Sequence, residues 1–288
     1  MRKIAILGCE NSHANNFLKY IKENPELADI EVVGVYSDEK EPPEKLRDVF
    51  GVPIMNDYTD AVGKIDGLVI TARHGDNHYK YAKPYIESGI PMFIDKPITI
   101  SEDEALTFMR ELRANGVRIT GGSSLKHADV IYDLKAKALA EEGGKTVGGV
   151  ARAPLSPDSP YGGFYFYAQH LVEMICEVFG RYPRSVKAIK SDVTRTVIFR
   201  YDGFDVTGLF CDTSWEYFAV RYSEKENQGG TVTLNNAFNR ELDEFYKLIL
   251  GEEQKISYDD FISPVFIMNA IERSLNSGKE EKIKEYKV

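Results

Sequence analysis

The first 120 residues alternate between short apolar runs and amphipathic stretches, and this alternation constrains the fold more than any other feature. Five runs rich in Ile, Val and Leu are typical of buried strands. They lie at residues 3–7, 30–36, 66–71, 91–94 and 117–120. Between them, apolar residues recur at helical spacing, as at Ala14, Phe17 and Ile21. Strands alternating with helices in this way predict right-handed crossovers and a parallel, doubly wound α/β sheet covered on both faces.

The second half of the chain has a different pattern. Residues 152–163 are rich in Pro, Ser and Gly and predict a long loop, which in a compact domain suggests function. Asp202 and Gly203 form a hairpin-turn signal within a β-rich region. Helices are expected near residues 128–142, 171–179, 240–250 and 259–276, and strands within 185–234. This half therefore predicts an α+β domain with a largely antiparallel sheet, and 288 residues suit two domains.

Composition and charge exclude several classes of protein. The formal net charge is −9, with a pI near 5.2, which argues against nucleic acid or an anionic membrane as the main partner. No apolar run approaches the roughly 20 residues that span a bilayer. Cys9, Cys176 and Cys211 have neither metal-ligand spacing nor an even number, so we expect a reducing, cytoplasmic setting. The first residues also lack the apolar core of a signal peptide.

The turn after the first predicted strand is the first candidate ligand site. A dinucleotide fingerprint has three glycines there, so that backbone amides can approach a pyrophosphate. Only Gly8 fits this pattern, and Glu10 would bring a carboxylate to the phosphates unless it points away. Asn11, Ser12 and His13 would then supply side-chain donors at the helix start. An ordinary helix N-cap explains Asn and Ser at these positions equally well.

Ser37 and Asp38 follow the second predicted strand. An acidic side chain at this point would bind the adenosine ribose of a dinucleotide, and no arginine is present for a ribose 2′-phosphate, which favours NAD over NADP. A solvated loop is the alternative explanation.

Asp95, Lys96 and Pro97 follow the fourth predicted strand and form the most informative segment. Pro97 restricts Lys96 to an extended conformation at the ligand edge of the sheet. Such a lysine can hold a substrate hydroxyl or transfer a proton, and Asp95 can tune it or bind a ribose. A surface Lys-Pro turn is the simpler alternative.

Several motifs in this order resemble the Gfo/Idh/MocA family, the group of glucose–fructose oxidoreductase and inositol dehydrogenase. They are the turn at Gly8, the DGLVIT strand with Asn77 and His78 beyond it, the Asp-Lys-Pro version of that family's Glu-Lys-Pro signature, Gly162 and Gly163, and His170. The resemblance implies a dinucleotide-binding Rossmann domain at residues 1–122 and an α+β domain at 123–288 that shapes the substrate site and mediates oligomers. It also implies that Lys96 binds the reacting hydroxyl and that His170 takes its proton.

The cofactor residues implied by this reading follow the predicted strands. They are Gly8, Asn11, Ser12, His13, Ser37, Asp38, Thr71, Arg73, His78, Asp95 and Lys96. Arg73 stands where members of the family commonly have proline, and could meet an anionic substrate, a cofactor phosphate or a surface carboxylate. His74, Asp76 and His78 superficially suggest a metal, but no further carboxylate or cysteine completes a site, so no metal is expected.

The segment before His170 departs from the family pattern. Members usually carry an aspartate four residues earlier, where this chain has Phe166. Tyr167 could replace that acid as a hydroxyl donor or proton relay, or could simply pack in the core. Tyr165 and Lys126 are candidates for binding the substrate.

The leading hypothesis is an NAD(P)-dependent oxidoreductase that acts on a secondary hydroxyl of a sugar, inositol or related polyol, as a homodimer or homotetramer formed through the C-terminal sheet. Two alternatives remain. One is a non-catalytic nucleotide or sugar sensor on the same scaffold. The other uses oxidation only transiently, to eliminate or hydrolyse a glycoside without net redox change.

Overall fold

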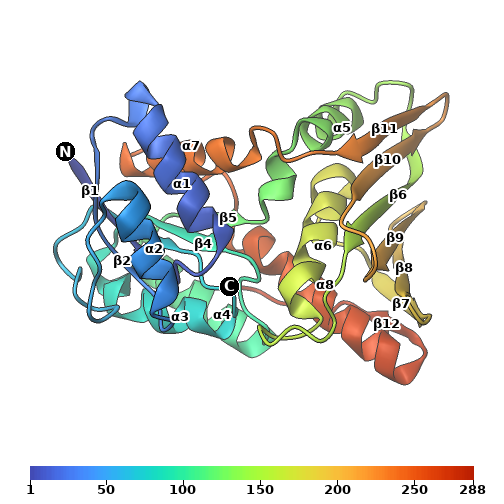
Figure 1. The fold of residues 1–288 in the computed structure, drawn as a ribbon. Coiled ribbons are helices and arrows are strands. Elements are labelled where there is room, and N and C mark those ends of the chain that lie inside the picture. Colours follow the sequence, from blue (N-terminus) through green and yellow to red (C-terminus); the bar gives the residue numbers. More distant parts are fainter.

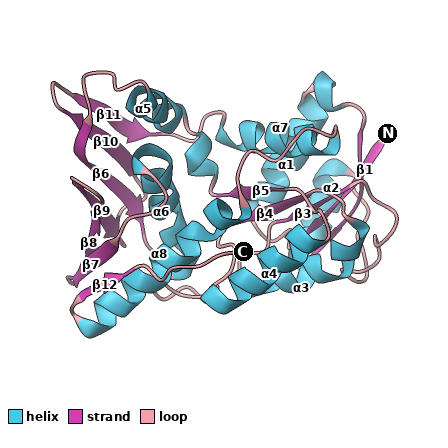
Figure 2. Ribbon diagram, turned by 180° about the vertical axis from the view of Figure 1, so that it is seen from behind, coloured by secondary structure: helices cyan, strands magenta, loops and turns pink.

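Two β-sheets, one from each half of the sequence, organise the structure (Figure 1). The computed structural model describes all 288 residues. Helices lie on both faces of the first sheet, and they fill the space between it and the second sheet (Figure 2). None of the helices is long and apolar enough to span a lipid bilayer.

The first sheet has five strands, all parallel, in the order β2-β1-β3-β4-β5. The strands are β1 (Arg2–Leu7), β2 (Ile30–Tyr36), β3 (Gly67–Ile70), β4 (Met92–Asp95) and β5 (Ile119–Gly122). The predicted parallel, doubly wound sheet is confirmed. The last strand lies two residues later than expected because Gly121 and Gly122, which look like a turn in the sequence, pair with Ile94 and Asp95.

The helices of the first half are α1 (Ser12–Glu23), α2 (Glu41–Phe50), α3 (Asp76–Ala82) and α4 (Glu102–Ala114), with short 3₁₀ turns η1 (Pro25–Leu27), η2 (Lys83–Ser88) and η3 (Ser124–His127). Local signals in the sequence set their ends. The Ser101 hydroxyl caps α4 by accepting a hydrogen bond from the Glu104 amide. Gly51 ends α2 in the left-handed conformation, with φ of 74°.

Two helices from the end of the chain, α7 (Ala237–Ile249) and α8 (Tyr258–Ser277), also cover the first sheet. Leu242 and Phe245 of α7 share a buried cluster with Phe17 of α1 and Phe93 of β4. The start of α8 joins the cluster on the other face, formed with α4. The hydrophobic core of the first sheet therefore depends on residues far beyond position 122, and the division of the chain at that point stays a prediction.

The second sheet has seven strands in the order β11-β10-β6-β9-β8-β7-β12. They are β6 (Thr146–Pro154), β7 (Ser185–Lys190), β8 (Thr194–Arg200), β9 (Asp205–Cys211), β10 (Tyr217–Ser223), β11 (Asn227–Val232) and β12 (Glu280–Lys282). All neighbours pair antiparallel except β6 and β9, which are parallel. The predicted largely antiparallel sheet is confirmed, although β6 extends three residues into the expected loop.

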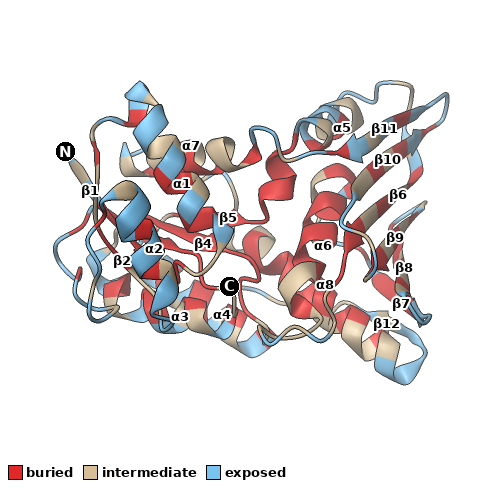
Figure 3. Cartoon of the chain, in the orientation of Figure 1, coloured by how far each residue is buried: buried red, intermediate tan, exposed pale blue.

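One face of the second sheet is buried against α5 (Asp129–Leu139) and α6 (Tyr165–Phe179). Along β8, buried side chains such as Val197 and Phe199 alternate with half-buried ones such as Ile198. This period of two shows that the sheet packs on its helices through one face and leaves the other uncovered (Figure 3). A single buried cluster joins the sheet to α6, which carries the candidate His170.

The buried Arg221 of β10 stabilises the edge of the second sheet. Its guanidinium donates to the carbonyls of Glu142 and Gly144 and to the side chains of Thr146 and Gln228. Arg221→Met should therefore lower the free energy of unfolding by about 2–4 kcal/mol, since two carbonyls lose their partner. Urea denaturation monitored by circular dichroism measures this.

The matched control is Arg200→Met, because Arg200 is about one third exposed and pairs with Asp205 at the surface. Its loss should cost about 1 kcal/mol or less. Equal losses for the two variants would contradict a structural role for the buried arginine.

Candidate active site

A cleft of about 370 Å³ lies between the two halves of the chain, at the carboxyl edge of the first sheet. The first half contributes residues that follow strands, and the second half contributes loop 155–164, the start of α6 and the segment around Trp215. The lining includes seven sequence-predicted residues: Asn11, Ser12, His13, Arg73, Lys96, Tyr167 and His170. Parallel strands end at one edge of their sheet, which explains why the first five gather there.

The carboxylate of Asp95 organises the first-half side of this cleft. It is fully buried, and it accepts hydrogen bonds from the side chain of Asn11 and the backbone amide of Lys96, both at 2.7 Å. His13 Nδ1 lies 3.1 Å from the same carboxylate, and His13 Nε2 lies 3.5 Å from Glu241 of α7. Burial raises the pKa of Asp95 to about 6, while His13 and Lys96 oppose that rise.

Asn11 precedes α1 without capping it, because its side chain donates to Asp95. The first-turn amides of this 12-residue helix therefore have no side-chain cap and point toward the ligand edge. Gly8 holds the preceding turn with φ of 74°, and a Cβ there would lie 2.4 Å from the Cα of Ala72. This close approach explains the one glycine of the fingerprint that the chain keeps.

Glu10 bridges the loops that follow β2 and β3. Its carboxylate accepts a hydrogen bond from the Ser37 hydroxyl at 2.7 Å and one from the Arg73 backbone amide at 3.0 Å. Asp38, the predicted ribose-binding acid, instead accepts from the hydroxyl of Tyr36 and pairs with Lys80. At this edge, therefore, Glu10 rather than Asp38 contacts Ser37.

Lys96 extends from the end of β4 into the cleft. Its Nζ lies 3.4 Å from the carbonyl of Phe166, and 4.5 Å and 5.3 Å from the ring centres of Phe166 and Tyr167. Burial lowers the pKa of Lys96, and the nearby Asp95 opposes this shift. The lysine thus lies against the two residues at the start of α6, Phe166 and Tyr167, that precede His170.

His170 lies in the first turns of α6, inside the cleft. Its Nδ1 is 2.6 Å from the Ser123 hydroxyl, which leaves Nε2 without a protein partner. Glu173 accepts from the Ser123 amide and so holds this serine in place. Burial lowers the pKa of His170 well below its usual value, and Lys96 and His13 add to the effect, so the ring is neutral at pH 7.

Aromatic rings form the remaining wall. Tyr167 lies edge-on to Trp215, with ring centres 5.2 Å apart, and it is also 5.4 Å from the ring of His170. Tyr217 lies 6.0 Å from the same histidine. No local pattern in the sequence marks Trp215 and Tyr217 as site residues, because aromatic residues on strands and turns usually pack in the core.

Eight predicted residues do not line the cleft. Gly8, Ser37, Asp38 and Asp95 lie beside it, as described above, and the other four bond elsewhere. Thr71 donates to the carbonyl of Gly8, and both ring nitrogens of His78 face backbone carbonyls, those of Ile98 and Ala72. The Tyr165 hydroxyl bonds Asn269 and Glu272 of α8. Lys126 bonds the carbonyl of Gly121. Their roles in binding cofactor or substrate have no support from these contacts.

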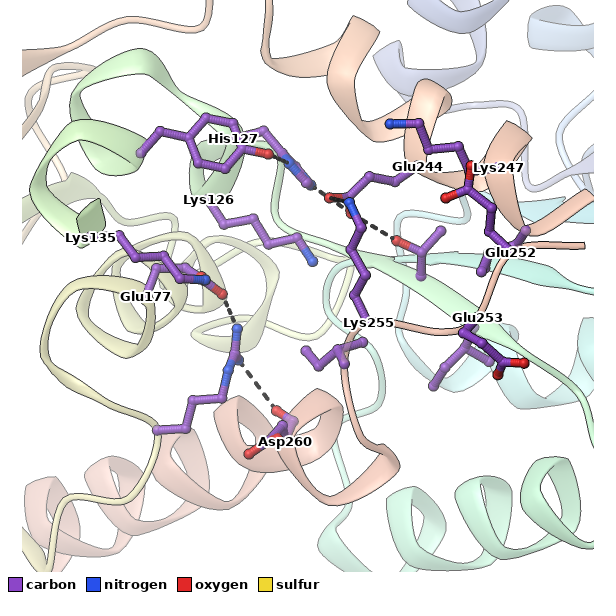
Figure 4. A pocket seen from close by; sticks show the side chains of 16 residues that line it. Lys126, His127, Lys135, Glu177, Glu244, Lys247, Glu252, Glu253, Lys255 and Asp260 are labelled. Carbon is purple, nitrogen blue, oxygen red and sulfur yellow. Dashed lines mark hydrogen bonds and ion pairs between the residues drawn. The ribbon is translucent and has the colours of Figure 1, made fainter. Parts of the chain in front are cut away.

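Lys126 lines a second cavity of about 300 Å³, whose lining comes from β5, η3, α5, α6, α7 and the segment that follows α7 (Figure 4). Five of its ten lysine, arginine, aspartate and glutamate side chains form ion pairs with one another. Lys135 and Arg181 both pair with Glu177, and Lys255 pairs with Glu244.

Solved structures share this fold over the whole chain. Myo-inositol 2-dehydrogenase from Lactobacillus plantarum has a TM-score of 0.85 at 16% identity, covering 98% of this chain and 99% of that one. Scyllo-inositol dehydrogenase from Lactobacillus casei, solved with NAD(H) and scyllo-inositol bound, has a TM-score of 0.85 at 14% identity, covering 98% and 99%. Myo-inositol dehydrogenase from Corynebacterium glutamicum has a TM-score of 0.84 at 17% identity, covering 99% of this chain and 100% of that one. These similarities define the fold as a Rossmann domain joined to an α+β sheet domain.

Residues 2–123 match the family model described as an oxidoreductase family with an NAD-binding Rossmann fold. This match over the Rossmann part of the chain confirms the resemblance to the Gfo/Idh/MocA oxidoreductase family seen in the sequence. No curated protein matches the chain significantly.

The buried His78 makes the stability of the fold depend on pH. Burial lowers its pKa from 6.5 to about 4, so its contribution is complete above pH 6.5 and is lost as the pH falls toward 4. This shift corresponds to about 3 kcal/mol. The free energy of unfolding of the wild type should therefore fall more steeply between pH 6.5 and 4 than that of His78→Asn.

Denaturant unfolding at several pH values measures both slopes. His74→Asn is the control, because His74 lies nearby but is partly exposed. Parallel slopes for the wild type and His78→Asn would show that His78 does not enter the fold as a buried neutral ring.

Proposed function

We propose that this chain is an NAD-dependent dehydrogenase that oxidises a secondary hydroxyl of a sugar, inositol or related polyol. The observation that carries the proposal is that Lys96 and His170, one from each half of the chain, line one cleft at the carboxyl edge of the Rossmann sheet. The structural relatives named above are inositol dehydrogenases, which supports a polyol as substrate.

The residues at the sheet edge fit a dinucleotide. The uncapped amides at the start of α1 suit a pyrophosphate, since a helix N-terminus favours anions. Ser37 and Glu10 offer a hydroxyl and a carboxylate at the end of β2, where a ribose binds in such sheets. Glu10 would repel a ribose 2′-phosphate, so this arrangement favours NAD over NADP. The cofactor supplies the hydride acceptor.

Lys96 and His170 divide the remaining chemistry between them. The Lys96 ammonium has no carboxylate partner and can donate a hydrogen bond to the substrate oxygen, stabilising the negative charge that develops there. When His170 Nδ1 donates to Ser123, Nε2 carries the free lone pair and can accept the hydroxyl proton. The carbon loses hydride and its oxygen loses a proton, which yields a ketone.

Tyr167 is proposed as a second donor to the substrate. Its ring lies between those of His170 and Trp215. It is next to Phe166, which occupies the position where members of the family usually carry an aspartate. The histidine therefore has no carboxylate on that side and stays neutral, as the buried environment requires.

Two other functions remain as alternatives on the same site. A sensor would bind cofactor and sugar without reducing the cofactor. A lyase or glycosidase without net redox change would need NAD but would not accumulate NADH.

We further propose a cytoplasmic homodimer or homotetramer. The uncovered face of the second sheet carries half-buried apolar side chains, including Ile198, Leu209 and Val220, which suit a second copy of the chain. The three cysteines are buried and free, which suits a reducing compartment.

Calorimetric titration of the purified protein with NAD, and separately with NADP, tests the cofactor assignment. Saturable binding of NAD in the micromolar range is expected, with NADP weaker. Failure to bind either nucleotide would contradict the proposed function.

Substitution of the two central residues tests the chemistry. Lys96→Met and His170→Asn should each lower kcat/KM by about 10²–10⁴-fold on a substrate that the wild type oxidises, because each removes a group that handles a proton or charge in the reaction. NADH formation followed at 340 nm measures the rate, and NAD calorimetry on both variants shows whether the cofactor still binds. Turnover close to wild type in both would overturn these roles.

A further inference from the structure

The charges that face the active-site cleft are all of one sign. Its lining contains two cations, Arg73 and Lys96, and two histidines whose pKa values burial lowers, His13 and His170, and it contains no aspartate or glutamate. The chain as a whole carries a net charge of −9. A cationic lining attracts anions to the site, while the carboxylates that dominate the rest of the surface repel them.

Arg73 is held at this cleft without an ion pair. Its Nη1 donates to the Tyr161 hydroxyl at 3.0 Å, and the guanidinium lies 5.1 Å from the centre of the Tyr161 ring. The arginines of the second half that sit near its surface, such as Arg152, Arg200 and Arg240, each pair with a carboxylate. Arg73 keeps most of its donors free, because one hydroxyl occupies only one of its five N–H groups.

Lys96 is likewise unpaired. The nearest carboxylate on its own strand, Asp95, is engaged by Asn11, His13 and the Lys96 amide and does not bind the Lys96 ammonium. Two cations with no carboxylate partner therefore line the same cavity. Lys96 is buried and Arg73 is half-buried. Leaving such charges unpaired is costly, so this pair is expected where a ligand supplies the opposite charge.

The second cavity, in contrast to the active-site cleft, is lined by charges of both signs. Five lysine and arginine side chains line it, and five carboxylates line it with them. Lys135, Arg181 and Lys255 are each paired with one of those carboxylates, whereas Lys126 and Lys247 are not. Figure 4 shows the labelled Lys135 beside Glu177 and Lys255 beside Glu244. The absence of carboxylates from the active-site cleft is thus particular to that cleft.

Aromatic rings complete the recognition surface. Tyr167, Tyr217 and the 64% exposed Trp215 present ring faces and edges to the cleft. Such rings bury the apolar C–H groups of a sugar while the polar groups reach hydrogen-bond donors. The cavity of about 370 Å³ is at the lower end of the range for small-molecule sites.

We propose that the substrate is a sugar or polyol that carries one anionic group, a carboxylate or a phosphate ester, and that Arg73 binds this group. The statement that this sugar is oxidised rests on the proposed function. The preference for an anionic ligand does not, because it follows from the charges of the cleft. A guanidinium suits both anions, because it can donate two parallel hydrogen bonds to either. Lys96 and His170 remain with the reacting hydroxyl.

Trp215 allows this to be tested without turnover. It is the only tryptophan in the chain and it lines the cleft, so its fluorescence reports occupancy directly. The wild type, with and without saturating NAD, is titrated with matched sets: glucose, glucuronate and glucose 6-phosphate, the same three forms of galactose, and myo-inositol with its monophosphate. Comparison of the two acids within a set distinguishes a carboxylate from a phosphate ligand.

At least one anionic member should bind about tenfold or more tightly than its neutral partner in the wild type. Arg73→Gln should lose this preference while binding the neutral sugar within about threefold of wild type, and Arg73→Lys should retain part of it. Arg200→Gln, a surface arginine of the second sheet, should bind like the wild type.

Equal binding of neutral and anionic partners in every set, or no response to any anionic sugar, would overturn the proposal. A preference that survives in Arg73→Gln, combined with weaker NAD binding by calorimetry, would overturn it in favour of a cofactor phosphate as the partner of Arg73. Failure of the wild type to bind NAD would instead contradict the proposed function and leave the charge comparison valid, because fluorescence needs no cofactor.

Discussion

The burial of one carboxylate, that of Asp95, is the constraint on which the rest of the site depends. A buried carboxylate must be met by donors or by opposite charge. Asn11 meets it from the start of α1, the Lys96 amide from the turn after β4, and His13 lies against it. Because these contacts occupy Asp95, the Lys96 ammonium is free to extend into the cleft, and the start of α1 is left uncapped. The burial of Asp95 thus positions both the uncapped amides of α1 that are proposed to bind phosphate and the Lys96 ammonium that is proposed to bind the hydroxyl.

The same group connects the two halves of the chain. His13 lies between Asp95 and Glu241, and Glu241 belongs to α7, which follows the whole second sheet in the sequence. Burial raises the pKa of Glu241 well above its usual value, which favours its neutral form beside the buried Asp95 network. The helix that completes the core of the Rossmann sheet therefore also closes the polar network beneath the cleft, which ties the integrity of the site to correct packing of the C-terminal helices.

The fold could be predicted largely from the sequence, and the site only in part. Buried runs and helical spacing are local signals, so the strands and their parallel order followed from them. Asn11, His13 and Lys96 could be grouped because each follows a strand of one sheet. The position of α7 could not be predicted, since an apolar helical stripe does not say which sheet it covers. Lys126 follows a strand as well, but the turn of η3 directs it to the second cavity. Tyr161, Trp215 and Glu241 reach the site through contacts between distant segments, which no local pattern encodes.

The contact between Arg73 and Tyr161 has a consequence for how the cleft opens. Tyr161 belongs to loop 155–164 of the second half, and its hydroxyl also lies 3.4 Å from Glu39 beside β2. The loop is therefore held to the first half of the chain at Tyr161 by two hydrogen bonds and one cation–π contact. Such contacts are worth about 1–2 kcal/mol together at a half-exposed position. Contacts of that strength break often at room temperature. An anion that draws the Arg73 guanidinium into the cleft would therefore release Tyr161 as it binds. Ligand capture and movement of the loop would then be one event.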